Sequence, residues 1–236
     1  MTLTAIMAST ELEASLILRS LADARKIVIQ NKFFFHGRLS GKETVVCLCG
    51  TGKVNAAHAA TVLIEKYSPE IIYNIGVAGA YPSSGLKIGD IAVAEKEICG
   101  DEGVLTGKGF CDMESIGLPL VFAHGRAYFN EFSMFVPEQL RDFRHRGNFV
   151  TVSACTGTLQ EGLKIEKRLS ALCESMEGAA IAHVCALNSL PVVEMRGISN
   201  IIEDRAAGPL SKRDIITAAE NVQRVFLEEL LLCDKI

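Results

Sequence analysis

Residues 175–200 form the part of the sequence whose side chains are best suited to chemistry. The pattern predicts a helix of small residues, a short turn and a buried strand, with Glu177 near one end and Asn200 just past the other. A carboxylate accepts hydrogen bonds, whereas an amide both donates and accepts them. The two side chains could converge on one ligand, so this segment is a candidate active site as well as part of the fold.

Other polar or glycine-containing segments follow predicted strands at comparable positions. Ligands in open α/β sheets bind beyond the carboxyl ends of the strands, so these segments are expected to meet at one rim of the sheet. They are residues 9–13, 76–79, 156–158 and 199–200, with Met176 and Glu177 opening a helix nearby in sequence. Each segment alone is a weak signal, but their arrangement predicts a binding site.

Each of these residues also has a structural explanation. Glu11 and Glu13 lie in the first turn of a predicted helix, where the helix dipole favours acidic residues without any catalytic role. The Gly-x-x-Gly sequence at 76–79 is typical of a tight turn and lacks the Lys and Ser or Thr of a phosphate-binding loop. Asn200 could cap the following turn, and His183, on an apolar helix face, is expected to pack in the core.

The composition is typical of a compact α/β protein. The 236 residues suffice for one large domain with a substantial core, and 49% of them are hydrophobic and 22% charged. A formal net charge of -4 gives no electrostatic reason to expect nucleic acid or an anionic membrane as partner. The sequence has neither the long apolar run of a membrane span nor the pattern of a signal peptide. We therefore expect a cytoplasmic protein with no membrane contact.

The eight cysteines are scattered along the chain. No Cys-x-x-Cys pair or histidine cluster has the spacing of a metal site. Several cysteines lie inside apolar runs, where a free cysteine behaves as a small hydrophobic residue. We expect reduced thiols, no metal and no cofactor.

Short apolar runs alternate with longer helical patterns along the chain. Strands are predicted at 3–8, 44–49, 70–75, 90–97, 148–155 and 190–198, and helices at 11–24, 56–67 and 211–232. Continuously apolar strands are typical of a sheet that helices cover on both faces. The sequence thus predicts a single three-layer α/β domain over residues 1–236, with a mixed, largely parallel central sheet. Residues 100–147 are the least regular part, with one predicted strand at 120–123.

Two motifs resemble those of the purine nucleoside phosphorylase and nucleosidase superfamily. One is Glu-Ser-Met-Glu-Gly-Ala-Ala at 174–180, and the other is Arg-Gly-Ile-Ser-Asn at 196–200, directly after a strand. Residues 8–13 resemble the acidic turn of methylthioadenosine/S-adenosylhomocysteine nucleosidases. Within the superfamily the nearest resemblance is to futalosine hydrolases, through Thr-Val-Ser-Ala-Cys-Thr-Gly-Thr at 151–158 and through Asp204 and Arg205. The resemblance spans nearly the whole chain.

The resemblance implies a nucleoside phosphorylase-like fold and hydrolysis of the N-ribosidic bond of futalosine. This reaction releases hypoxanthine and dehypoxanthine futalosine on the futalosine route to menaquinone. Breaking the bond creates an oxocarbenium-like sugar and an anionic purine, and the enzyme must stabilise both. By resemblance, Glu13 orients and deprotonates the attacking water. Glu177 binds the ribose 2′- and 3′-hydroxyls, and Met176 packs on the ribose ring.

The remaining expectations follow from the same resemblance. Arg196 and Ser199 are expected to support the site behind the ribose. The other expected substrate-binding residues are Val77, Ala78, Gly79, Cys155 and Thr156. The expected partners are a small nucleoside substrate and further copies of the chain, in a homodimer or higher homo-oligomer.

Asn200 departs from the adenosine-type nucleosidases, which carry Asp at this position. A 6-aminopurine presents the acceptor N7 beside a donor, whereas a 6-oxopurine presents two acceptors, N7 and O6. The NH2 group of an Asn carries two donors and can serve both, so Asn200 favours hypoxanthine or guanine as the base. Asn also pairs with adenine through N6 and N7, so adenine stays open.

A second departure concerns phosphate. The phosphorylases hold phosphate with arginines, one of them just before the Gly-x-x-Gly segment, whereas here Asn74 and Ile75 precede Gly76. This difference favours water as the nucleophile. Three alternatives stay open: a methylthioadenosine or S-adenosylhomocysteine nucleosidase, an inosine-type purine nucleoside phosphorylase, and a nucleoside-binding protein that has lost catalysis.

Overall fold

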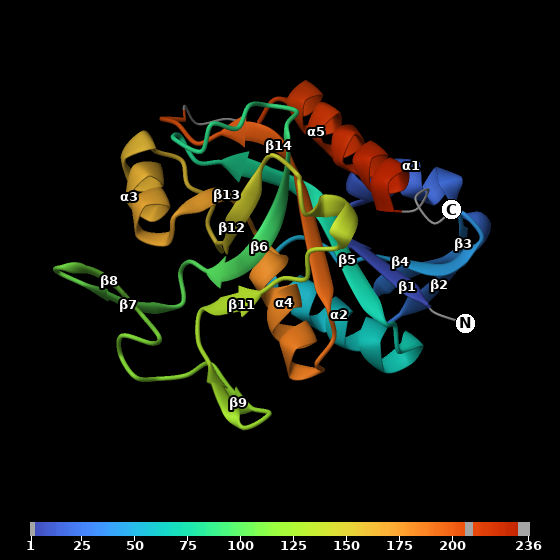
Figure 1. Cartoon of the computed structure of the whole chain (residues 1–236), viewed down its shortest axis with the longest axis horizontal. Helices are drawn as coiled ribbons and strands as arrows, with labels where there is room; N and C mark the ends of the chain where they lie inside the picture. The colour runs from blue at the N-terminus through green and yellow to red at the C-terminus, as the bar shows by residue number, and fades with distance from the viewer. Residues whose placement is uncertain (1–2, 206–209, 231–236) are drawn as a thin grey trace.

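A mixed sheet with helices on both faces organises residues 3–205 and 210–230, which are the residues described by the structure, a computed structural model (Figure 1). The strands of the main sheet are β1 (Thr4–Ala8), β2 (Ala22–Ile29), β3 (Lys32–Leu39), β4 (Lys42–Leu48), β5 (Ile71–Ala80), β6 (Ile91–Cys99), β11 (Glu131–Ser133), β12 (Arg146–Thr151), β13 (Ala171–Ser175) and β14 (Val192–Ile201). The helices are α1 (Glu11–Ser20), α2 (Lys53–Tyr67), α3 (Leu159–Leu169), α4 (Gly178–Leu187) and α5 (Lys212–Val225), with single turns η1 (Glu138–Leu140) and η2 (Phe226–Leu230).

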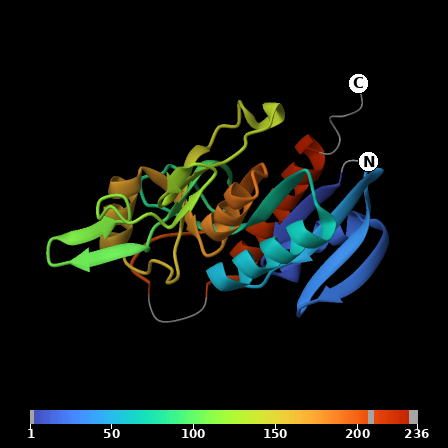
Figure 2. The same cartoon turned by 90° about the horizontal axis from the view of Figure 1, so that it is seen from below.

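Helices α1 and α5 cover one face of the sheet, and α2 and α4 cover the other (Figures 1 and 2). A buried amide joins the first pair, since Gln223 accepts a hydrogen bond from the backbone N–H of Leu16 at 2.7 Å and donates to the carbonyl of Leu12 at 3.2 Å. The expected three-layer α/β arrangement with a mixed sheet is confirmed.

Parallel pairings join β4, β1, β5 and β14 in that order. The carboxyl ends of these strands therefore lie at one edge of the sheet, where the sequence predicts the site. Five strands also form a closed ring, because β14 pairs with β6, β6 with β12, β12 with β13, and β13 with β5. Side chains from this ring line the base of the site described below.

Several elements differ from the sequence-based expectations. The helix predicted at 11–24 ends at Ser20, because Leu21 adopts an extended conformation and β2 begins at Ala22. Strand β2 was not predicted, because it is an edge strand whose side chains are mostly exposed and its apolar run is confined to residues 27–29. Helix α3 and strands β3, β11 and β13 were also missed, as were the short strands β7 (Gly103–Thr106), β8 (Gly109–Asp112) and β10 (Arg126–Tyr128). The helix predicted at 211–232 begins at Lys212, and residues 231–232 lie outside the described residues.

The Gly-x-x-Gly segment at 76–79 is not a turn. Both glycines lie within β5, and Ser199 and Asn200 lie within β14 rather than beyond it. The two strands pair along this stretch, with Ile198 opposite Ala78 and a shift in register before Asn200 meets Gly79. The glycines are needed because side chains of neighbouring elements occupy the space of a Cβ, as described below.

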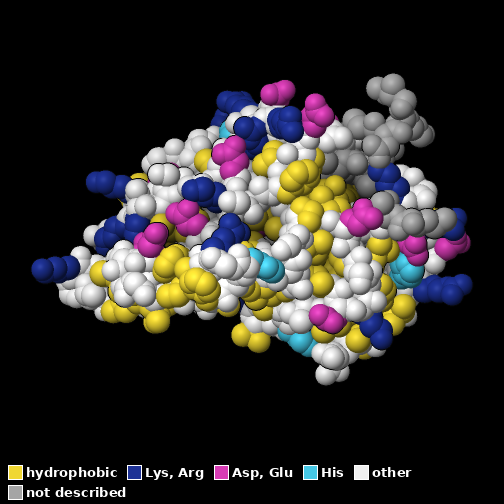
Figure 3. Space-filling model, turned by 60° about the horizontal axis from the view of Figure 1, so that its bottom comes forward, with side chains coloured by type: hydrophobic (Ala, Val, Ile, Leu, Met, Phe, Trp, Pro, Cys, Tyr) yellow, Lys and Arg dark blue, Asp and Glu magenta, His cyan; other side chains and the backbone are white. Residues whose placement is uncertain are grey.

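Two small hairpins project from the body in the region of residues 100–147 (Figures 1 and 2). They are β7 (Gly103–Thr106) with β8 (Gly109–Asp112), and β9 (Val121–Ala123) with β10 (Arg126–Tyr128). The strand predicted at 120–123 corresponds to β9. Figure 3 shows exposed hydrophobic side chains on this side of the molecule, and the large ones within residues 103–128 are Val104, Leu105, Ile116, Leu118 and Phe122. Across the described ranges, no helix has both the length and the apolar character required to cross a membrane.

Helix α5 packs so closely on β14 that Gly197 has no room for a side chain. A Cβ at this position would lie 2.1 Å from the carbonyl oxygen of Ala218. We expect Gly197→Ala to push α5 from the sheet and to lower the free energy of unfolding by ~1–3 kcal/mol, measured by urea denaturation. Gly107→Ala is the control, since no atom lies within 4 Å of its Cβ position. Equal stability of the two variants would contradict this account.

Candidate active site

Glu13 and Arg196 face each other across Gly76 of β5. A Cβ on this glycine would lie 2.4 Å from Nη1 of Arg196 and 2.6 Å from Oε1 of Glu13. Both side chains are buried, with exposed fractions of 5% for Glu13 and 1% for Arg196. Two residues from opposite ends of the sequence thus meet at one point because the strand between them lacks a side chain there.

Hydrogen bonds fix the carboxylate of Glu13. Thr10, the N-cap of α1, donates to Oε2 from its backbone N–H at 3.0 Å and from its hydroxyl at 2.8 Å. Oε1 accepts from the backbone N–H of Val77 at 3.0 Å, which leaves this oxygen a further lone pair. Burial raises the pKa of Glu13, and the Val77 hydrogen bond and the charge of Arg196 offset this only in part. Glu13 therefore caps its helix and also presents a carboxylate of raised basicity.

The guanidinium of Arg196 is held on one side only. Its Nε donates to Oε1 of Glu194 at 2.7 Å, whereas Nη1 and Nη2 have no hydrogen-bond partner among the described residues. Burial acts to lower the pKa of Arg196, but the carboxylates of Glu194, Glu177 and Glu13 outweigh it and raise the pKa. Arg196 stays charged, and its unpaired N–H groups are donors for a polar ligand beside Glu13.

Glu177 occupies the N-cap of α4 and lies close enough for its charge to raise the pKa of Glu13. Its Oε1 accepts from the backbone N–H of Gly52, the N-cap of α2, at 2.8 Å. Its Oε2 accepts from the backbone N–H of Met176 at 3.3 Å. These bonds orient the carboxylate and leave lone pairs on both oxygens that can accept from the hydroxyls of a ligand.

Ser199 and Asn200 lie beside the second glycine of β5. The hydroxyl of Ser199 is 3.0 Å from Oδ1 of Asn200 and 3.2 Å from the carbonyl oxygen of Ala78. The amide nitrogen of Asn200 lies 3.0 Å from the position that a Cβ on Gly79 would occupy. This nitrogen donates no hydrogen bond to any group within the described residues. Asn200 therefore presents its NH2 group, with its carbonyl oxygen already in contact with Ser199.

Residues 152–158 close one side of this region. Thr156 donates from its backbone N–H to Oε1 of Glu174 at 2.6 Å and from its hydroxyl to Oε2 at 2.7 Å. The same carboxylate accepts from the hydroxyl of Tyr81 at 3.0 Å, so Glu174 anchors this loop. Cys155 is exposed, whereas Thr156 is buried and engaged by Glu174.

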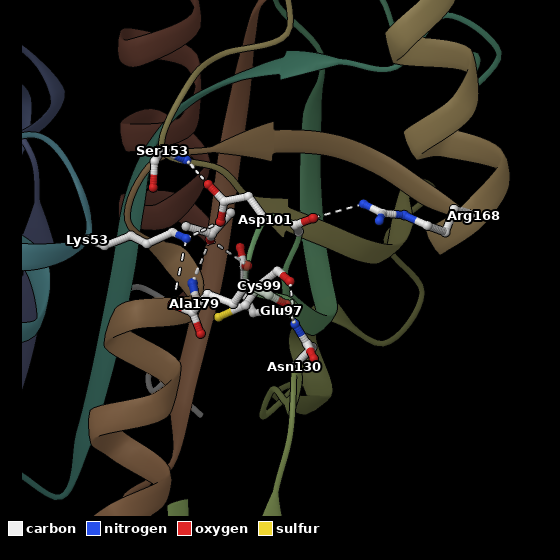
Figure 4. Close-up of polar contacts among 11 residues, drawn as sticks. Lys53, Glu97, Cys99, Asp101, Asn130, Ser153, Arg168 and Ala179 are labelled. Carbon is white, nitrogen blue, oxygen red and sulfur yellow. Dashed lines mark hydrogen bonds and ion pairs between the residues drawn. The ribbon is translucent and has the colours of Figure 1, made fainter. Parts of the chain in front are cut away.

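A second anchor lies at the end of β6. Lys53, at the start of α2, forms an ion pair with Asp101, whose other oxygen accepts from the backbone N–H of Ser153 at 2.6 Å (Figure 4). The hydrogen bond from Lys53 and that from Ser153 lower the pKa of Asp101, although burial opposes them. Arg168 donates to the carbonyl of Gly100 at 2.8 Å. These contacts hold the 152–158 loop against the start of α2, beside the residue that binds Glu177.

The site residues expected from the sequence fall into three groups. Glu13, Val77, Arg196 and Glu177 are connected by hydrogen bonds or mutual charge, with Met176 donating to Glu177, and Ala78, Gly79, Ser199 and Asn200 lie side by side along β5 and β14. Cys155 and Thr156 lie in the loop that Glu174 anchors. The sequence reasoning missed the buried side chains of Glu97, Thr151, Glu174 and Glu194. His183 stacks on Phe132 at a ring distance of 4.8 Å, so its expected packing role is confirmed.

A cavity of about 930 Å³ lies apart from these residues, between α4 and the segment of residues 110–133. The side chains of Glu13, Glu177 and Asn200 do not line this cavity. We therefore locate the candidate site by its convergent polar side chains and not by cavity volume. No group of His, Cys, Asp and Glu side chains suited to a metal ion occurs within residues 3–205 and 210–230.

The chain belongs to the phosphorylase superfamily, whose family model matches residues 4–231. It is similar to the 5'-methylthioadenosine/S-adenosylhomocysteine nucleosidase of Maridesulfovibrio salexigens, with 31% identity over 238 residues that cover 95% of this chain and 97% of that protein. The nucleosidase of Staphylococcus epidermidis is 31% identical over 202 residues, or 85% of this chain and 87% of that one.

Solved structures show the same fold. The Streptococcus pneumoniae nucleosidase with a transition-state inhibitor superposes with a TM-score of 0.82 at 23% identity, covering 99% of this chain and 100% of that chain. The expected nucleoside phosphorylase-like fold is confirmed. The expected class of enzyme, an N-glycosyl hydrolase of the purine nucleosidase type, is the class of these relatives.

Proposed function

We propose that the chain hydrolyses the N-ribosidic bond of a purine nucleoside. The observation that carries the proposal is the pairing of a buried carboxylate, Glu13, with the unpaired N–H groups of Arg196 beside Gly76. An acceptor and donors that face the same point are the groups that hold and activate a water molecule. In this proposal Glu177 binds the sugar and Asn200 binds the purine base of the same substrate.

The nucleophile is assigned to the Glu13 side of the site. A water beside Gly76 would donate a proton to Oε1 of Glu13 and accept from Nη1 of Arg196. Its oxygen attacks C1′ of the ribose while the bond from C1′ to N9 breaks, and the bonding electrons leave with the purine. The proton of the water passes to Glu13, whose raised pKa makes it a stronger base than an ordinary carboxylate.

The ribose is assigned to Glu177 and Met176. The carboxylate of Glu177 has lone pairs left after its contacts with Gly52 and Met176, and the 2′- and 3′-hydroxyls are donors of matching type. Such contacts strengthen as positive charge develops on the sugar in the transition state. Met176 then packs on the ribose ring.

The purine is assigned to Asn200 and Ser199, and this assignment favours a 6-oxopurine. Oδ1 of Asn200 is in contact with the Ser199 hydroxyl, so the two donors of the NH2 group are left for the acceptors N7 and O6. An amide has no proton to transfer, so Asn200 would stabilise the leaving purine through hydrogen bonds. Futalosine, which carries hypoxanthine, fits this recognition.

Methylthioadenosine or S-adenosylhomocysteine is the second substrate candidate, and the names of the relatives support it better than they support futalosine. The candidates share the mechanism assigned to Glu13 and Glu177 and differ in the base. Asn200 is the side chain expected to discriminate between the two bases. Phosphorolysis of inosine has less support, because the buried groups around Arg196 are carboxylates, which repel an anionic nucleophile such as phosphate.

A homo-oligomer and a cytoplasmic location stay predictions. The exposed hydrophobic side chains of the projecting hairpins, such as Leu105 and Phe122, support an interface on that side of the molecule (Figure 3).

Release of free base from futalosine, inosine and methylthioadenosine, measured side by side, tests the proposed function. We expect release without phosphate in the buffer, with futalosine the fastest substrate. Faster release from methylthioadenosine would select the second candidate. Strict dependence on phosphate would rule out hydrolysis, and tight binding of all three without turnover would indicate a binding protein.

Glu13→Gln is expected to lower kcat by ~10² or more, because an amide cannot accept a proton from water. Gln keeps an acceptor for the backbone N–H of Thr10, so the helix cap survives in part. In the unchanged protein, kcat/KM should fall as pH decreases through the raised pKa of Glu13, which lies above the ordinary carboxyl value of 4.5. Glu11→Gln, exposed in the same helical turn, is the control. Equal rates for the two variants would exclude Glu13 as the base.

Asn200→Asp is expected to lower kcat/KM for 6-oxopurine nucleosides more than for 6-aminopurine nucleosides. A carboxylate opposite O6 brings lone pairs together at a cost of ~1–3 kcal/mol, which corresponds to a loss of about 5- to 150-fold. Asn188→Asp, at the exposed end of α4, controls for the added charge. If both classes of nucleoside lose activity equally, the assignment of Asn200 to the base edge is wrong.

A further inference from the structure

Two buried carboxyl groups lie behind the site, and the proposed mechanism gives neither of them a role. Glu97 from β6 and Glu194 from β14 are both fully buried and meet beside Gly178, the first residue of α4. A Cβ on Gly178 would lie 2.1 Å from Oε1 of Glu97 and 2.7 Å from Oε1 of Glu194. The absence of a side chain at Gly178 is what allows the two carboxyls to approach each other there.

If both carboxyl groups are ionised, the pair has more hydrogen-bond acceptors than the surrounding residues supply donors for. Oε2 of Glu97 accepts from the hydroxyl of Thr151 at 2.8 Å, and Thr151 accepts from the backbone N–H of Ala179 at 2.7 Å (Figure 4 shows Glu97 and Ala179). Oε1 of Glu97 and Oε2 of Glu194 accept from no described residue. Two buried anions with opposed lone pairs are costly, and a proton on Glu97 that is donated to the Glu194 carboxylate removes one of the two charges.

We propose that Glu97 is protonated in the folded protein and donates its hydrogen bond to Glu194, which in turn orients Arg196 toward Glu13. The ion pair between Glu194 and Nε of Arg196 spans 2.7 Å, and the far end of the same guanidinium lies at Gly76, opposite Oε1 of Glu13. Glu97 and Glu194 are therefore positioning residues for the general base. Their catalytic role rests on the proposed function of Glu13, whereas the protonation of Glu97 does not.

The surroundings of Glu97 favour the neutral acid. Burial and then the charge of Glu194 raise the pKa of Glu97 well above its ordinary value, and the Thr151 hydrogen bond and the charge of Arg196 oppose this only in part. The other titratable groups that face it are the thiols of Cys173 from β13 and of Cys99 on its own strand. Burial raises the pKa of both thiols, so neither adds a charge near pH 7.

Proton uptake on folding tests the protonation without any assay of activity. The folded protein keeps the proton of Glu97, whereas the unfolded chain releases it above the ordinary carboxyl pKa of 4.5. From this group alone, the unfolding equilibrium constant rises about tenfold per pH unit between those two pKa values. Glu97→Gln removes the titrating group, and its amide can still accept from Thr151 and donate to Glu194.

We therefore expect the pH dependence of the unfolding constant of Glu97→Gln, measured by urea denaturation between about pH 5.5 and 8, to be shallower by one proton. Glu95→Gln is the matched control, since it removes an exposed carboxyl, paired with Arg146, from the same strand. An unchanged slope in Glu97→Gln would overturn the proposal. Failure of this variant to fold would do so too, because the amide reproduces the hydrogen bonds of the neutral acid.

The pH profile of kcat/KM tests the positioning role. Glu194→Gln removes the anion that partly neutralises Arg196, so the pKa of Glu13 should fall and the acidic limb should move to lower pH, with kcat lowered at least ~10-fold. Glu97→Gln should keep the acidic limb of the unchanged protein. A purely structural role of Glu194 would lower kcat and leave the limb in place, and that result would overturn the positioning role.

The two measurements separate failure of this inference from failure of the proposed function. If no nucleoside is hydrolysed, the proposed function is wrong. The change in the pH dependence of unfolding in Glu97→Gln still decides whether Glu97 is protonated. If hydrolysis occurs and the linkage is unchanged, the inference alone is wrong.

Discussion

The buried guanidinium of Arg196 is the interaction on which the rest of the site depends. A charge with an exposed fraction of 1% is costly to bury unless neighbouring groups compensate for it. Here Glu194 pairs with Nε directly, while Glu13 and Glu177 contribute negative charge from two helices. Removal of one partner would leave a buried charge uncompensated. The strands and helices that carry these groups are therefore constrained to one arrangement, and that arrangement sets the position of Glu13, the proposed general base.

More carboxyl groups than cations surround Arg196, and this balance of charge determines which nucleophile and which transition state the site favours. Such an environment suits a neutral nucleophile and a substrate that becomes cationic at the sugar, because negative charge stabilises an oxocarbenium-like transition state. It is unfavourable for a phosphate ion. In the proposed reaction the neutral amide of Asn200 faces the leaving purine, and its N–H donors complement the negative charge that develops there. The distribution of charge thus follows the change in charge along the proposed reaction.

Much of this arrangement could be predicted from the sequence, because apolar runs indicate buried strands and short motifs indicate site residues. Contacts between distant segments could not be predicted. The strands β1, β4 and β5 have apolar runs that report burial directly, and Glu13, Glu177 and Arg196 stand in recognisable motifs. Strand β2 was missed because most of its side chains are exposed and its large apolar residues are confined to 27–29, at one end. The glycines at 76 and 79 have the pattern of a turn, because sequence cannot show that side chains distant in the chain occupy the space beside them. Glu97 and Glu194 lie in apolar strands and become partners only when β6 and β14 pair.

The closed ring of β5, β14, β6, β12 and β13 has a consequence for how such a protein can diversify. Strands in a ring cannot separate locally without breaking pairings on both sides, so Arg196 and Asn200, which β14 carries, are held in a frame that resists change. The hairpins of residues 103–128 belong to no strand of the ring and can vary without disturbing it. New substrates are therefore expected to arise through changes in the hairpins and at single positions such as Asn200, the proposed contact to the purine, while the proposed hydrolytic centre is inherited intact.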